Sequence, residues 1–256
     1  MSFRADSPLV DAIHASPNME PRRGGRRPTI LLLHYTGMMD ATRAIDWLAR
    51  PESRVSCHYV VDEAGRVTQM VAENMRAWHA GVSYWAGERD INSASIGIEI
   101  HNPGRELGYP DFPAAQMAAV TALGRDIVAR HAIRPQAVLG HSDVAPERKA
   151  DPGEKFPWAT LAAAGVGHWV APVPIDAADE GLAEGAREPA VAVAQMQLAS
   201  YGYEIAETGV LDRQTAFVLR AFQLHFRQQR VDCRLDRSTA ATLSALLAAR
   251  PEPATS

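Results

Sequence analysis

One apolar run constrains the fold more than any other feature of the sequence. The residues from Ile30 to Leu33 are continuously apolar, and the run stops at His34 (TILLLH). Such a run is typical of a strand buried on both faces, so the sheet that contains it must be covered by other layers above and below. We expect the final histidine to be presented at the edge of that sheet.

Further patterns extend this layered arrangement. Residues 95–100 (SIGIEI) alternate like a strand, residues 58–71 predict a β-hairpin, and residues 137–141 (AVLGH) form a short apolar run that ends in a histidine. Amphipathic helices are predicted over residues 41–50 and over the Ala-rich stretch 114–132. The sequence therefore predicts an α/β fold with a mixed central β-sheet flanked by helices.

Composition and charge exclude several classes of protein. The chain has 256 residues, of which 46% are hydrophobic and 22% charged, and this balance fits globular domains and excludes collagen, coiled coil and extensive disorder. No apolar run reaches the ~18–20 residues that cross a bilayer, so we expect no membrane span. A net charge of −4 gives no overall field for nucleic acid. Cys57 and Cys233 cannot form a disulfide framework, which favours a reducing compartment.

The two ends of the chain differ from its centre. Residues 1–28 are predicted to form loops that end in PRRGGRRP, whose arginines we expect in a solvated turn rather than on an anionic ligand. Residues 171–189 are rich in Pro, Ala, Gly and acidic residues, which indicates a linker. We therefore expect a first domain over 1–172, a linker over 173–189 and a helical domain over 190–250.

Three helical patterns follow the linker, at residues 190–203, 212–228 and 236–250. Asp212 and Asp236 open the second and third patterns and suit N-capping. The apolar positions expected to face a common core are Val193, Met196, Leu198, Phe217, Leu219, Phe222, Phe226, Leu243, Leu246 and Leu247. The spacing predicts a small three-helix bundle. We expect the linker to tether this bundle without making it part of the first domain's core.

Two of the nine histidines stand out by their positions. His34 and His141 each end a hydrophobic strand pattern, where side chains leave the sheet and converge, and a polar loop rich in possible oxygen ligands (142–153) follows His141. Two histidines and one carboxylate, with a fourth position left open for water, form a recognised catalytic zinc set. Spacing alone leaves a purely structural role open, because no short motif ties these residues together.

Five stretches of the sequence resemble a known family. They are LLLHYTGM, SCHYVVDEAGRVTQMV, AWHAGVSYWAG, NSASIGIEIHNPG and GHSDVAPERKADPGEKFPW, and they span about residues 17–160. The chain resembles the zinc-dependent N-acetylmuramoyl-L-alanine amidases of the AmpD and AmiD type, whose fold is shared with peptidoglycan recognition proteins. The HYT sequence is more similar to the AmiD branch. The C-terminal helices resemble a peptidoglycan-binding domain of the PGBD-1 type, although Cys233 stands where a glycine is usual.

The resemblance implies a role for individual residues. The family's ligands to one zinc ion per chain fall on His34, His141 and Asp151, its acidic catalytic residue on Glu99, and its loop lysine on Lys149. A carboxylate can carry the proton of the attacking water to the leaving nitrogen, and a lysine can stabilise an oxyanion. The residues expected to line the substrate groove are Tyr35, Trp78, His79 and Asn92, although Trp78 could equally belong to the core and His79 could instead support a metal ligand.

Alternative roles remain open for some residues. Glu99 could merely face solvent, and Lys149 could be an ordinary exposed lysine. Asp143 is a rival metal ligand by its closeness to His141, but it suits a turn-capping or supporting role better.

The leading function implied by the resemblance is hydrolysis of the amide between N-acetylmuramic acid, or its 1,6-anhydro form, and L-alanine in peptidoglycan or muropeptides. The alternative is a receptor that binds the same substrate without cleaving it. We expect a monomer without a nucleic-acid partner. Residues 1–17 show no secretory signal, so we expect a cytoplasmic location, with a periplasmic or cell-wall location as the alternative.

Overall fold

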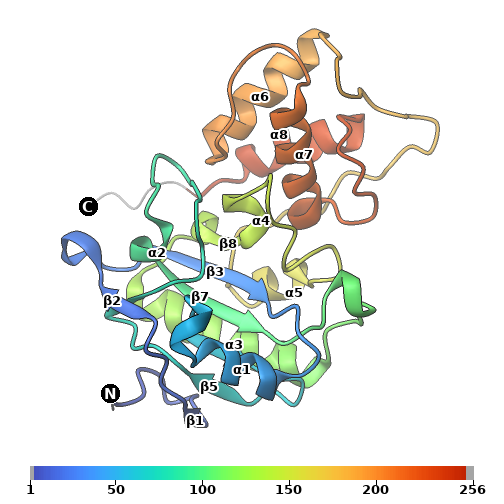
Figure 1. Ribbon diagram of the computed structural model, residues 1–256. Coiled ribbons are helices and arrows are strands. Elements are labelled where there is room, and N and C mark those ends of the chain that lie inside the picture. Colours follow the sequence, from blue (N-terminus) through green and yellow to red (C-terminus); the bar gives the residue numbers. More distant parts are fainter. Residues whose placement is uncertain (1–2, 252–256) are drawn as a thin grey trace.

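A computed structural model describes residues 3–251 (Figure 1). The strands are β1 (Ala12–Ile13), β2 (Met19–Pro21), β3 (Ile30–Tyr35), β4 (Tyr59–Val61), β5 (Val67–Gln69), β6 (Met75–Ala77), β7 (Ser95–Ile100) and β8 (Val138–Gly140). The helices are α1 (Ala41–Leu48), α2 (Ile91–Ala94), α3 (Ala114–His131), α4 (His141–Val144), α5 (Trp158–Ala163), α6 (Pro189–Tyr201), α7 (Arg213–Phe226) and α8 (Arg237–Ala248). Short 3-10 helices lie at η1 (Arg23–Gly25), η2 (Pro51–Ser53), η3 (Arg105–Leu107) and η4 (Pro135–Ala137). Within residues 3–251, no helix is both long and apolar enough to cross a membrane.

A mixed sheet forms the centre of the first domain. Six strands lie in the order β1-β5-β4-β7-β3-β8, and β2 pairs with β6 in a separate two-stranded sheet. β3 is parallel to both β7 and β8, whereas β4 and β5 form an antiparallel pair. The predicted α/β architecture is confirmed, including the hairpin within residues 58–71.

β3 is buried on both faces, as its sequence predicts. Leu31 and Leu33 belong to a cluster that contains apolar residues of α3. Ile30 and Leu32 point to the opposite face, since side chains alternate along a strand, and they belong to a second cluster. None of the four is more than 4% exposed. His34 lies two residues after Leu32, so its side chain points to the same face of the sheet as those of Ile30 and Leu32.

The N-terminal segment contains more structure than the predicted loops. β1 pairs with β5 and β2 pairs with β6, but strands of two or three residues leave no hydrophobic period in the sequence. The expectation of a solvated arginine turn is wrong for Arg22, which is only 6% exposed. Its guanidinium donates to the carbonyl oxygens of Glu73, Ser93 and Ser95, so it satisfies buried backbone acceptors between the two sheets.

Helices α6, α7 and α8 form the predicted bundle, and Asp212 and Asp236 cap α7 and α8 as expected. The predicted inner face of α6 is wrong at Val193 and Met196, which are 48% and 51% exposed. The buried apolar positions of α6 are instead Val191, Ala194, Leu198 and Tyr201. Apolar residues surround this helix, so the sequence pattern does not distinguish its inner face from its outer face.

The bundle packs directly on the first domain, which contradicts the expectation of a loose tether. The cluster that contains Ile30 and Leu32 also contains apolar residues of α6, α7 and α8. At its centre, the ring of Trp85 lies 4.9 Å from that of Tyr203. A Cβ on Gly202 would come within 2.7 Å of the Trp85 ring, so this close approach requires glycine. Pro and acidic residues indicate a linker, but they say nothing about the surface on which the following helices pack.

Candidate metal and catalytic site

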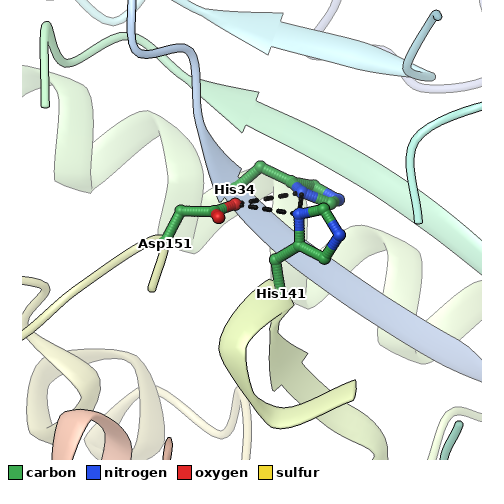
Figure 2. A group of neighbouring side chains, drawn as sticks. All are labelled: His34, His141 and Asp151. Atoms are coloured by element: carbon green, nitrogen blue, oxygen red, sulfur yellow. Dashed lines mark hydrogen bonds and ion pairs between the residues drawn. The ribbon is translucent and has the colours of Figure 1, made fainter. Parts of the chain in front are cut away.

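Three side chains from separate elements converge beyond the sheet, and Figure 2 shows them turned toward one another. His34 lies near the end of β3, His141 begins α4 directly after β8, and Asp151 lies in the loop that follows. Nδ1 of His34 is 2.9 Å from Nδ1 of His141. Oδ2 of Asp151 lies 3.3 Å from the first of these nitrogens and 3.1 Å from the second. The structure therefore brings together the three residues expected to bind zinc.

Strand register places Glu99 beside this group. β3 and β7 are parallel, and Glu99 of β7 is the direct partner of His34. Partners in a ladder point to the same face of the sheet, so Glu99 shares the face of His34 while Ile98 and Ile100 join the core on the other face. Glu99 is half-buried, and its Oε2 has no hydrogen-bond partner within the described residues. It does not simply face solvent.

A chain of hydrogen bonds fixes the ring of His34 from behind. Nε2 of His34 lies 3.0 Å from Nδ1 of His79, and Nε2 of His79 lies 3.3 Å from Oγ of Ser95. The His79 ring rests against Gly97, where a Cβ would come within 2.6 Å of it. Gly97 thus makes room for the His79 ring. Because His79 contacts Nε2 of His34, Nδ1 of His34 stays directed at Asp151 and His141. Such outer contacts orient metal-binding histidines.

The second histidine is held in a similar way. Nε2 of His141 lies 3.1 Å from the carbonyl oxygen of Ala80, so its Nδ1 is free for a ligand. Asp143 is not part of the group: its Oδ2 accepts from the backbone N–H of Gly140 at 2.8 Å and closes the turn into α4. The expected supporting role of Asp143 is therefore the one that the geometry favours.

The charge states in the group suit a metal site. Burial and the neighbouring His141 lower the pKa of His34 to about 4, so its ring is neutral near pH 7. Burial alone would raise the pKa of Asp151, but His141 and His34 hold it well below its usual range. Burial and the negative charge of Asp151 raise the pKa of Glu99 well above its usual value, and Lys149 opposes this shift.

The residues fit a tetrahedral metal ion. One ligand atom from each residue lies within 4.8 Å of the others, and all three residues are buried. Zinc bonds of about 2.0–2.2 Å place tetrahedral ligand atoms about 3.3 Å apart. The three separations here, 2.9, 3.1 and 3.3 Å, are close to that value. Two nitrogens and one carboxylate oxygen also leave a fourth position for water or substrate.

The group opens into a cavity of about 510 Å³. Of the residues predicted to act in catalysis or substrate binding, the cavity wall contains Tyr35, Trp78, His79, Glu99 and Lys149. Asn92 does not line it among the described residues; its Oδ1 accepts from the backbone N–H groups of His79 and Ala80 and so supports the loop that carries them. Trp47 and Arg148 also line the cavity, although no sequence pattern predicted them there. Trp47 lies on α1 and is 42% exposed. The apolar pattern of that helix does not indicate that this side chain lines the cavity.

Comparison with protein families agrees with this geometry. Residues 24–154 match the family model described as N-acetylmuramoyl-L-alanine amidase. The N-acetylmuramoyl-L-alanine amidase AmiD of Escherichia coli is 35% identical over 233 residues, which cover 86% of this chain and 83% of AmiD. The chain belongs to the N-acetylmuramoyl-L-alanine amidase family. It is an amidase of this family, and residues 187–243 match a second model, described as a peptidoglycan binding domain.

Other relatives and solved structures extend the comparison. The 1,6-anhydro-N-acetylmuramyl-L-alanine amidase AmpD of Escherichia coli is 36% identical over 161 residues, or 56% of this chain and 86% of AmpD. The structure of Escherichia coli AmiD with anhydro-N-acetylmuramic acid-L-Ala-D-gamma-Glu-L-Lys superposes with a TM-score of 0.73 at 34% identity, covering 90% of this chain and 92% of AmiD. AmpDh3 of Pseudomonas aeruginosa gives the same TM-score at 32% identity, covering 98% and 97%. The mixed sheet and the C-terminal helices therefore follow an architecture found in such amidases.

Proposed function

We propose that this amidase is zinc-dependent and cleaves the amide bond between N-acetylmuramic acid, or its 1,6-anhydro form, and L-alanine in muropeptides or peptidoglycan. The observation that carries this proposal is the buried group of His34, His141 and Asp151 at the base of a cavity whose wall also contains Glu99. A zinc ion held there would polarise the scissile carbonyl and acidify water near neutral pH. The anhydromuropeptide bound to AmiD supports the choice of substrate.

Glu99 is the group we assign to proton transfer. In its ionised form it accepts a proton from the attacking water, and it then delivers that proton to the leaving amide nitrogen. Glu99 lies on β7 beside His34, and its Oε2 is buried without a hydrogen-bond partner in the described chain. Both features suit this task, because neither oxygen is neutralised by a permanent ion pair. The raised pKa of Glu99 also favours a carboxyl that can hold the proton between the two steps.

Lys149 is the group we assign to the oxyanion. It lies two residues before Asp151 and lines the same cavity, so its ammonium can stabilise the negative charge that develops on the carbonyl oxygen. Trp78 and Tyr35 provide apolar and aromatic wall for the sugar or the lactyl group, and Trp47 adds a further indole to that wall. We assign Asn92 and His79 to the support of the site.

We propose a catalytic domain over 1–172, a linker over 173–189 and a peptidoglycan-binding domain over 190–250. The match of residues 187–243 to a peptidoglycan binding domain supports the last assignment.

The test is metal-dependent product release. The purified protein should contain one zinc per chain, should release free stem peptide from anhydromuropeptide and from intact murein fragments, and should lose this activity with a chelator and regain it with zinc. A protein that binds muropeptide but releases no peptide at full zinc occupancy would instead be a receptor. Comparing the two substrates also determines whether the anhydro form is preferred.

A further inference from the structure

The chain between Gly140 and Phe156, which we name the ligand segment, carries most of the candidate site. It contains His141, Asp151 and Lys149, so two of the three candidate metal ligands depend on its conformation. Much of this segment is irregular: only its first few residues form helix α4. A loop that must hold two ligands in place needs support from outside itself.

The first support acts through Asp143. This carboxylate is buried, and within the ligand segment it accepts a hydrogen bond from the N–H of Gly140. The bundle supplies the others: the hydroxyl of Tyr203 donates to Oδ1 at 2.6 Å, and Nδ1 of His225 lies 2.7 Å from Oδ2. A buried carboxylate needs several donors to offset its lost hydration. Tyr203 and His225 therefore complete the hydrogen bonding of the residue that closes the turn at His141.

The second support acts on the backbone beyond His141. Arg220 donates to the carbonyl oxygen of Pro146 at 2.7 Å. Gln228 donates through one amide nitrogen to the carbonyl oxygens of Glu154 and Phe156, at 2.7 and 2.8 Å. These acceptors flank Asp151 on both sides. These carbonyl groups are partly buried in an irregular loop, where regular secondary structure supplies no partners, and the carbonyl oxygen of Phe156 also accepts from the N–H of Trp158.

The bundle also covers the ligand segment sterically. Figure 1 shows α7 lying against α4, the helix that begins with His141. The imidazole of His225 stacks on the ring of Trp158, just after the segment, with centroids 3.6 Å apart. The donors from α7 and its neighbouring loops thus reach the segment near its start, its middle and its end.

We propose that the C-terminal bundle is a structural part of the metal site, and that Tyr203, His225 and Gln228 are positioning residues for the ligand segment. This role rests on the proposed zinc-dependent function and goes beyond peptidoglycan binding. It makes metal affinity depend on side chains more than fifty residues away in sequence from the nearest ligand. Supporting partners of this kind change metal affinity about 10–100-fold when they are removed.

The experiment compares two tyrosines in the full-length protein. Tyr203→Phe removes the hydroxyl that binds Asp143, whereas Tyr201→Phe removes a hydroxyl that binds Nδ1 of His168 in the same core. Zinc affinity is measured by competition with a chromophoric chelator. Cobalt spectra of the substituted site report ligand geometry directly. We expect Tyr203→Phe to weaken zinc binding about 10–100-fold and to shift the cobalt bands, with Tyr201→Phe close to wild type.

A second pair of variants guards against misfolding. His225→Asn keeps a donor close to the position of Nδ1, so it should retain more zinc affinity than His225→Ala. Equal zinc affinities and cobalt spectra for Tyr203→Phe, Tyr201→Phe and wild type would overturn the positioning role while leaving the proposed function intact. A folded wild-type protein that takes up no zinc would overturn the proposed function itself, and this inference with it.

Discussion

Replacing Glu99 by glutamine separates the chemistry of the site from its metal binding. The substitution keeps the shape of the side chain and removes its ability to take a proton. Glu99 is not one of the three converging ligand residues, so zinc content should be unchanged. General base catalysis contributes about 10²–10⁴-fold, so kcat should fall by that factor, which corresponds to about 3–5 kcal/mol of barrier.

The same variant should gain stability when it is metal-free. The pKa of Glu99 is raised in the folded protein, so its contribution favours folding below the unfolded value near 4.5 and is lost as pH rises through the folded pKa. Above that pH, the wild type must hold an ionised carboxylate whose Oε2 has no partner in the described chain. Glutamine removes this charge, so Glu99→Gln should be more stable than wild type at pH 8 and of similar stability at pH 4.

Three measurements check both effects: zinc content, release of stem peptide from anhydromuropeptide, and urea unfolding of the metal-free proteins at the two pH values. Glu99→Asp serves as the control, because it retains the acid and shortens its reach. Near-normal kcat for Glu99→Gln at full zinc occupancy would refute the assignment of proton transfer to this residue. A variant less stable than wild type at pH 8 would refute the argument from its buried charge.

Lys149→Ala should lower kcat about 10²–10³-fold while zinc content stays the same, and unchanged kcat would remove Lys149 from the mechanism. Trp85→Ala should lower the free energy of unfolding by about 3–5 kcal/mol, because it leaves a cavity in the core shared with the bundle. Trp47→Ala, at a partly exposed position, should lower it far less when both variants are unfolded in urea. An equal loss of free energy in the two variants would contradict the shared core. Burial and the positive charge of Arg22 lower the pKa of His58 to about 3. The metal-free wild type should therefore lose stability as pH falls below about 6.5, and this residue should contribute up to about 1.4 kcal/mol per pH unit to the loss. Urea unfolding of His58→Asn with the same pH dependence as wild type would contradict this.

The sequence predicts the sheet and the site wherever a strand has a strong pattern. The apolar run from Ile30 to Leu33 is long enough to identify a strand buried on both faces, and it fixes the place of His34. His141 follows another apolar run, and parallel neighbours bring their ends to the same edge. Alternation within SIGIEI places Glu99 on the face opposite its isoleucines. Asp151 lies in an irregular loop, so only the family resemblance singled it out.

The packing of the bundle could not be predicted in the same way. Helical periodicity identifies α6, α7 and α8, but it does not state which surface of the first domain they contact. The partners of Asp143 are a tyrosine after α6 and a histidine on α7, and neither has a sequence signature for this contact. Arg22 illustrates the same limit: a basic tract predicts solvent exposure, whereas the fold uses this arginine to satisfy buried carbonyl groups.

The alternation of side chains along β3 connects these observations. Ile30, Leu32 and His34 share one face of the strand, and the first two lie in the core that includes the bundle. The face that presents the first candidate ligand is therefore the face on which the C-terminal helices are anchored. The ligand segment connects the C-terminal helices with His34: Val144 belongs to the shared core, and His141 and Asp151 turn toward His34. We therefore expect a change in bundle packing to reach the candidate ligands through a few side chains. The far end of the ligand segment is anchored differently, since Phe156 belongs to the core on the α3 face together with Leu31 and Leu33.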